Sequence, residues 1–155
     1  TVVLIVNYTP EEGAFGFILN RASTVPLAEA VRSFPKSEFQ LFFGGPVEED
    51  AMFYIHQCDK EIEGAQPIKE NLKWDGDFEE ILRLIDSGVL HPGNIKFFSG
   101  YSGWTAGQLE AELDQRSWII GDLGASQILE FESELLWKSS LSSLARRRAG
   151  PSPDF

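Results

Sequence analysis

The apolar residues of this chain stand in short runs separated by glycine, proline and polar residues, and this spacing limits the fold more than any other feature. The first run, at residues 2–6, consists of valine, leucine and isoleucine, which favour a strand covered on both faces. Later runs predict strands too, because short apolar runs bounded by turn residues are typical of them. The predicted strands are residues 2–6, 14–19, 41–43, 52–56, 95–98, 118–120 and 128–131.

A second periodicity, with apolar residues three and four positions apart, predicts helices elsewhere in the chain. Thr24 is placed to cap a short helix that ends before Pro35, and Ser133 is placed to cap the last helix. Gly88 is the expected stop of another helix. The polar residues between 59 and 77 are expected to be irregular. The predicted helices span about 24–34, 78–87, 105–115 and 133–144.

Strands and helices alternate here without a regular strand-helix-strand rhythm, which argues against a doubly wound parallel sheet. The sequence therefore predicts an α+β fold, with a mixed, largely antiparallel sheet and about four helices. The 155 residues suffice for one core, so we expect a single domain over 1–145. Residues 146–155 hold three arginines and then prolines, and they are expected to form a flexible basic tail.

The charge of the chain limits its partners. With 24 acidic and 13 basic residues, the formal charge is −11, which opposes binding to a polyanion, so direct DNA binding is not expected. No apolar run approaches the roughly 18 residues of a membrane span, so a membrane association is not expected either. The single cysteine, Cys58, cannot form an internal disulfide, which favours a cytoplasmic protein.

Catalytic and metal-binding patterns are weak in this sequence. The two histidines, His56 and His91, stand apart and lie in no zinc-binding motif, so we assign no metal and no cofactor. Ser102 lies between a predicted strand and a predicted helix, as a hydrolase nucleophile would. The glycine that such an elbow needs two residues later is replaced by Trp104. We therefore assign no catalytic residue.

The junction after the predicted strand 95–98 is the best-specified part of the sequence. Thr105 and Gln108 form a capping-box pattern, and Trp104 is placed to pack onto Leu109. Gly100 and Gly103 would let backbone N–H groups approach an anion at the positive end of the following helix. A tight, well-capped turn without a ligand explains the same pattern and is the favoured interpretation.

A second glycine segment, Gly44-Gly45-Pro46, follows another predicted strand and has the same two interpretations. If the two segments met in space, they would line a cleft together with Tyr101 and Trp104. Asn20 and Arg21, after a further strand, would then supply a donor pair and a bidentate cation. Both are equally ordinary residues for the end of a strand.

Several sequence blocks in fixed order form a signature. They lie at residues 1–5, 13–21, 43–47 and 107–113, and above all in Phe98-Ser99-Gly100-Tyr101-Ser102-Gly103-Trp104. With these blocks the chain resembles the YqgE/AlgH family. The resemblance implies a bacterial cytosolic α+β domain with bent sheets, of a kind often labelled a transcriptional regulator without an agreed activity. The signature positions that it implies here are Asn20, Arg21, Gly44, Gly45, Pro46, Gly100, Tyr101, Gly103, Trp104, Gln108, Leu109 and Glu110.

Two functional hypotheses follow. The first is a non-enzymatic regulatory or binding domain, acting on transcription indirectly, whose cleft takes a small anionic ligand or a protein partner. The second is an enzyme that clamps a small anionic metabolite between Arg21 and backbone donors. The candidate binding residues for either are the signature positions other than Leu109.

Overall fold

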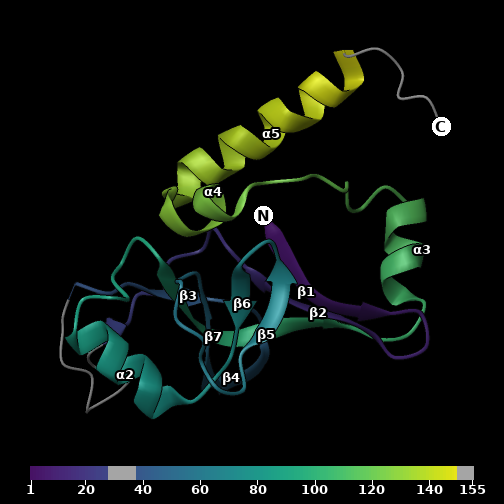
Figure 1. Cartoon of the computed structure of the whole chain (residues 1–155). Helices are drawn as coiled ribbons and strands as arrows, with labels where there is room; N and C mark the ends of the chain where they lie inside the picture. The colour runs from purple at the N-terminus through teal and green to yellow at the C-terminus, as the bar shows by residue number, and fades with distance from the viewer. Residues whose placement is uncertain (28–37, 150–155) are drawn as a thin grey trace.

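The computed structural model describes residues 1–27 and 38–149, with side chains up to residue 144. The described residues form a seven-stranded sheet and four helices (Figure 1). The strands follow the order β1-β2-β7-β4-β6-β5, and β3 pairs with β7 beside this path. The elements are β1 (Val3–Thr9), β2 (Gly13–Ile18), β3 (Leu41–Phe43), β4 (Val47–His56), β5 (Gln66–Lys69), β6 (Leu72–Trp74), α2 (Phe78–Asp86), β7 (Ile95–Trp104), α3 (Gln108–Asp114), α4 (Ala125–Glu130) and α5 (Ser133–Ala149).

Strand β7 organises the sheet because its two halves pair with different neighbours. The first half lies antiparallel to β4 and parallel to β3, while the last three residues lie antiparallel to β2. Gly100, in the left-handed region at φ 67°, separates the two halves. The α+β class and the mixed, largely antiparallel sheet are thus confirmed, and β3 with β7 is the one parallel pair among the described strands.

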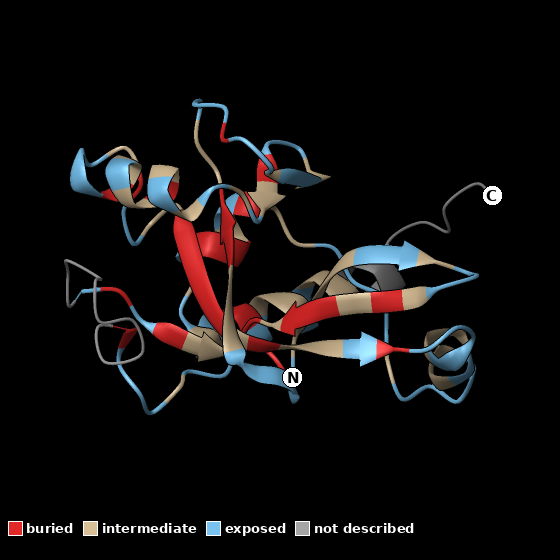
Figure 2. Cartoon of the chain, turned by 90° about the horizontal axis from the view of Figure 1, so that it is seen from below, coloured by how far each residue is buried: buried red, intermediate tan, exposed pale blue. Residues whose placement is uncertain are grey.

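Two apolar cores form where neighbouring residues of β7 point to opposite faces of the sheet. Phe97 belongs to the core under α2, with Ile81 and Ile85 from that helix. Phe98 belongs to the other core, where its ring stacks on Phe17 at 4.7 Å between centroids. Figure 2 shows buried residues along the central strands, whereas exposed residues lie mainly in the outer loops and on the outer sides of helices. Helices α4 and α5 supply the cover of the second core.

Two predicted strands in the C-terminal third are wrong. Residues 118–120 form no strand, and Ile119 and Ile120 are 59% and 68% exposed. The second, predicted at 128–131, is mostly helix α4. Ala125, Ile128 and Leu129 of α4 are all buried in the second core. Their spacing of three and four residues suits a helix, whereas the short apolar run at 128–131 taken alone also fits a strand.

The polar stretch 59–77 was expected to be irregular, but it contains the hairpin β5–β6. Leu72 is fully buried there, and Glu70 makes the turn at φ 49°. Most of the predicted helix at 24–34 lies outside the described residues. Helix α2 is confirmed: the Asp77 carboxylate accepts from the Glu79 N–H at 3.1 Å, and Gly88 follows the helix at φ 82°.

The last helix, α5, runs outward past α4 (Figure 1). Leu136, near its start, is fully buried and anchors it to the second core. The helix continues to Ala149 and so includes the three arginines at 146–148. Residues 150–155 lie outside the described residues, so the flexible tail stays a prediction.

Candidate functional site

The two glycine segments do meet, but they meet by direct backbone packing. The Gly44 N–H donates to the Ser99 carbonyl at 2.8 Å, and the Ser102 hydroxyl donates to the Gly44 carbonyl at 3.1 Å. A Cβ on Gly44 would lie 2.4 Å from the Gly100 carbonyl oxygen, and a Cβ on Gly45 would lie 2.2 Å from the Tyr101 carbonyl carbon. These distances leave no room for a ligand between the segments.

The expected glycine loop leading straight into a helix is wrong. Residues 99–104 belong to β7, and α3 begins only at Gln108, after Gly107 in the left-handed conformation. Half of the expected capping box forms nonetheless, because the Gln108 side-chain oxygen accepts from the Thr105 N–H at 3.0 Å. The strand continues because β2 pairs with residues 102–104, a long-range contact that local pattern does not report.

Asn20 and Arg21 have structural partners at the far end of β2. The Asn20 side-chain oxygen accepts from the Val2 N–H at 2.9 Å, which fastens the start of the chain. The Arg21 guanidinium lies 4.4 Å from the centroid of the Phe43 ring. Neither residue lines either of the two hollows that the described residues form and that are described below, so the structure does not place Arg21 beside them.

Beside the glycine segments, strands β2, β4, β6 and β7 enclose an open hollow of about 560 Å³, which we call the aromatic groove. Four rings meet edge to face in it: the centroid of Phe15 lies 5.0 Å from Trp74 and 5.7 Å from Tyr101, and Phe53 lies 5.6 Å from Tyr101. Its lining residues are Glu12, Ala14, Phe15, Val47, Phe53, Trp74, Tyr101, Gly103, Trp104 and Thr105.

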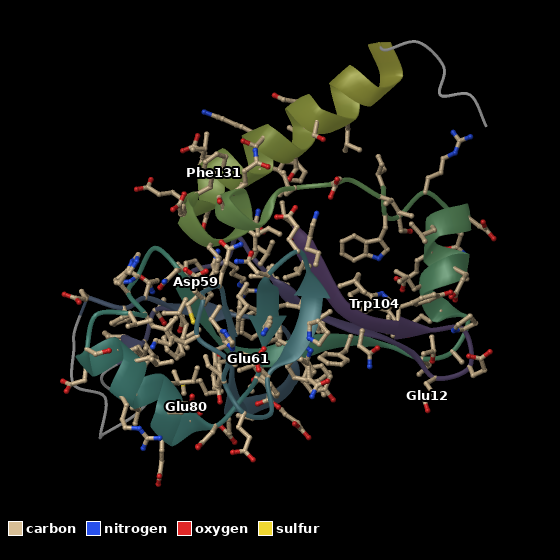
Figure 3. The ribbon with its side chains drawn as sticks, viewed as in Figure 1. Glu12, Asp59, Glu61, Glu80, Trp104 and Phe131 are labelled. Atoms are coloured by element: carbon tan, nitrogen blue, oxygen red, sulfur yellow. The ribbon has the colours of Figure 1, made fainter. Side chains whose placement is uncertain are left out.

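The surroundings of the aromatic groove are acidic. Glu12 lines it directly, and Figure 3 shows Glu12 on the same side of the molecule as Trp104. Val47 begins β4, and the three residues after it, Glu48, Glu49 and Asp50, are exposed. None of the lining residues is a lysine or an arginine. The groove therefore suits an apolar group that carries or neighbours a positive charge.

A second hollow, of about 460 Å³, shares Val47, Gly103 and Trp104 with the groove, and we call it the tryptophan pocket. The indole N–H groups of Trp104 and Trp118 both donate to one Glu112 oxygen, at 2.7 and 2.8 Å. Those two bonds, led by Trp118, lower the pKa of Glu112. The pocket is lined by Pro46, Val47, Ser102, Gly103, Trp104, Glu112, Gln115, Ser117 and Trp118.

The remaining signature residues brace α3. The Gln108 amide donates to the other Glu112 oxygen at 3.2 Å. The Tyr8 hydroxyl donates to the Glu110 carboxylate, and this bond raises the pKa of Tyr8 and lowers that of Glu110. The Trp104 ring also contacts the Trp118 ring, at 5.9 Å between centroids. Its expected packing onto Leu109 stays a prediction.

Of the candidate residues, Pro46, Tyr101, Gly103 and Trp104 line one or both of the two hollows found among the described residues. The other walls were not predicted because they come from strands distant in sequence, from α3 and its flanking residues, or, like Trp118, from a segment that was predicted to be a strand. Glu112 had a weak local signal, since it stands four residues after Gln108 on one helix face. The lining residues outside the candidate set are Glu12, Ala14, Phe15, Val47, Phe53, Trp74, Ser102, Thr105, Glu112, Gln115, Ser117 and Trp118.

The buried histidine has an ordinary structural partner. His56 is buried, its Nε2 donates to the Asp75 carbonyl at 2.8 Å, and burial lowers its pKa. Within residues 1–27 and 38–149, no three or more His, Cys, Asp or Glu side chains gather as metal ligands would. No helix among the described residues has the length and apolar character needed to cross a bilayer.

Comparison with known proteins places these features in context. The family model described as DUF179, AlgH-like, matches residues 1–148. A UPF0301 protein of Chlorobium luteolum is 38% identical over 143 residues, which cover 92% of this chain and 75% of that protein. One from Cytophaga hutchinsonii is 39% identical over 145 residues, covering 93% of this chain and 79% of that protein.

Two solved structures share the fold. The solution structure of the AlgH protein from Pseudomonas aeruginosa matches with a TM-score of 0.77 at 23% identity, covering 100% of this chain and 86% of that one. A crystal structure of a Corynebacterium diphtheriae protein matches with a TM-score of 0.71 at 19% identity, covering 98% of this chain and 78% of that one. At these identities the likeness concerns the fold alone.

Proposed function

The chain belongs to the AlgH-like family, and on that premise we propose that it is a non-enzymatic binding domain that holds a segment of a basic protein partner in the aromatic groove. The observation that carries this proposal is the groove itself. It exposes parts of four aromatic rings on a scaffold of paired strands, with Glu12 among them. Aromatic side chains dominate the energetics of protein interfaces because they bury much apolar area with little loss of conformational freedom.

The charge of the chain selects among partners. A protein with a formal charge of −11 attracts a basic segment and repels a polyanion, so the regulatory role that we propose acts through a protein and not through DNA. We propose the cytoplasm as its location, because the lone Cys58 suits a reducing compartment.

An enzyme acting on a small anionic metabolite is the alternative class. It would need a cation beside a hollow, and Arg21 lies over Phe43 instead. The lining of the groove offers rings and a carboxylate, which do not stabilise a negative transition state. We therefore favour the binding domain.

Selection of peptides from a random display library against the folded chain tests the proposal. The selected peptides are expected to combine an aromatic residue with lysine or arginine, and to bind with micromolar dissociation constants. Val47→Lys should weaken the binding of these peptides at least tenfold. Val47 lines the groove and is 36% exposed, so a lysine there would repel the basic residues of the peptides.

Val25→Lys is the matched control, since Val25 is a valine that is 44% exposed and lines neither hollow. Calorimetric titration of both variants with the selected peptides gives the comparison. Peptides that lack basic residues, or that bind both variants equally, would contradict the proposal.

A further inference from the structure

The tryptophan pocket presents a carboxylate whose charge has no cationic partner among the described side chains. Glu112 forms no ion pair within the described residues, and the pocket lining contains no lysine or arginine. The two indole N–H bonds and the Gln108 amide occupy about three of the roughly four acceptor positions of the carboxylate. One acceptor position is therefore left for a further donor.

The rest of the pocket also offers acceptors and rings. The Ser102 hydroxyl gives its proton to the Gly44 carbonyl, so its oxygen can still accept a hydrogen bond. Trp104 and Trp118 stand at 76° to one another and form two aromatic walls. Rings, a carboxylate and free acceptors together match a group that has a positive charge, several N–H donors and no acceptor.

We propose that the tryptophan pocket binds a lysine or arginine side chain of the partner whose apolar segment occupies the neighbouring aromatic groove. The pocket and the groove share Val47, Gly103 and Trp104, so one extended segment reaches both. The source of the cation, a partner protein, rests on the proposed function. The chemistry of the pocket does not, because it follows from Glu112 and its walls.

Titration of the full ¹⁵N-labelled chain with capped amino acids tests this inference. N-acetyl-arginine methylamide and N-acetyl-lysine methylamide should shift the indole N–H signals of Trp104 and Trp118 in a saturable way. N-acetyl-citrulline methylamide, the neutral analogue of the arginine compound, should bind at least fivefold more weakly. Equal shifts from the citrulline and arginine compounds would overturn the inference, as would no shift from either cation.

Variants assign the effect to Glu112. Glu112→Gln keeps an acceptor for the indoles but removes the charge, and it should weaken the arginine compound at least fivefold. Asp114→Asn, an exposed carboxylate on the same helix but outside the pocket lining, should leave the binding unchanged. Gln115→Lys adds a cation at the exposed rim of the pocket without altering Glu112, so it should also weaken binding of the arginine compound. This variant keeps the inference testable even if Glu112→Gln does not fold. Unchanged binding in Gln115→Lys would overturn the inference.

Two further outcomes separate the inference from its premise. Agmatine, a free small cation, should bind no more tightly than the capped arginine. Tenfold tighter binding of agmatine would overturn the inference, because it would make the ligand of the pocket a small metabolite and not a partner side chain. If the capped cations bind but no displayed peptide depends on Val47, the pocket stands and the proposed function fails. If displayed peptides depend on Val47 but the capped cations do not bind, the inference about the tryptophan pocket fails and the proposed function of the aromatic groove stands.

Discussion

Replacing Gly100 with alanine should lower the free energy of unfolding by about 3 kcal/mol or more. Gly100 has φ 67°, where a side chain costs about 1–2 kcal/mol. Its Cβ would also lie 2.3 Å from the Gly45 carbonyl oxygen, a backbone atom that cannot swing away, and such overpacking costs about 1–3 kcal/mol more. Urea unfolding followed by circular dichroism measures the change.

Gly103→Ala is the control for this prediction. Gly103 is three residues away in the same strand, but a Cβ there meets only the edge of the Tyr101 ring, at 3.5 Å. It should cost less than about 1 kcal/mol. Equal and small losses in both variants would contradict the packing role of Gly100 and would reopen the idea that the glycines leave room for a ligand.

Replacing Lys96 with methionine should stabilise the protein at neutral pH. Lys96 is only 4% exposed, and its ammonium donates to the Leu19 carbonyl at 2.8 Å and lies 4.1 Å from the Phe42 ring centroid. Burial lowers its pKa from 10.5 to about 8, which corresponds to a penalty of about 3 kcal/mol for the buried charge. Loss of the bond to Leu19 offsets part of this penalty, so we expect a net gain of about 1–2 kcal/mol.

The pH dependence identifies the cause of that gain. Between about pH 8 and 10.5, the unfolded chain keeps the Lys96 proton and the folded chain loses it, so the stability of the unaltered protein rises with pH in this window. Lys96→Met should not share this rise. The advantage of the variant should therefore shrink from neutral pH to pH 10, whereas the exposed Lys60→Met should show no such trend. A constant difference between variant and parent would contradict the account.

Strand β3 and the first part of β7 were predictable because their apolar composition matches the burial of these residues in the folded sheet. Residues 41–43 and 95–98 are apolar runs that end up buried or half-buried in the sheet, as their sequence indicates. The 99–104 segment was not predictable, because its glycines are typical of a loop while its pairing with β2 depends on residues almost ninety positions earlier. The run 128–131 fits a strand and a helix equally, and only packing on the second core decides between them.

The candidate site was predictable only in part. Glycine patterns indicate where backbones approach closely, and Gly44, Gly45 and Gly100 do so, but pattern alone does not say whether a ligand or another strand fills the space. Tyr101 and Trp104 were identified from their block, whereas Phe15, Phe53 and Trp74 reach the groove through strand pairing. The interaction of Trp118 with Glu112 depends on how the segment after α3 returns to β7.

The central claim, that the aromatic groove holds a basic protein segment, has a direct test in the four tryptophans of the chain. Trp74 lines the groove, Trp104 lines both hollows, Trp118 lines the tryptophan pocket, and Trp137 lies on α5 outside both. The measurement is a titration of the ¹⁵N-labelled chain with the tightest displayed peptide, followed through the indole N–H signals. The account predicts that the Trp74 and Trp104 signals move to saturation while the Trp137 signal stays in place. A peptide that binds while the Trp74 signal stays fixed and the Trp137 signal moves would contradict it.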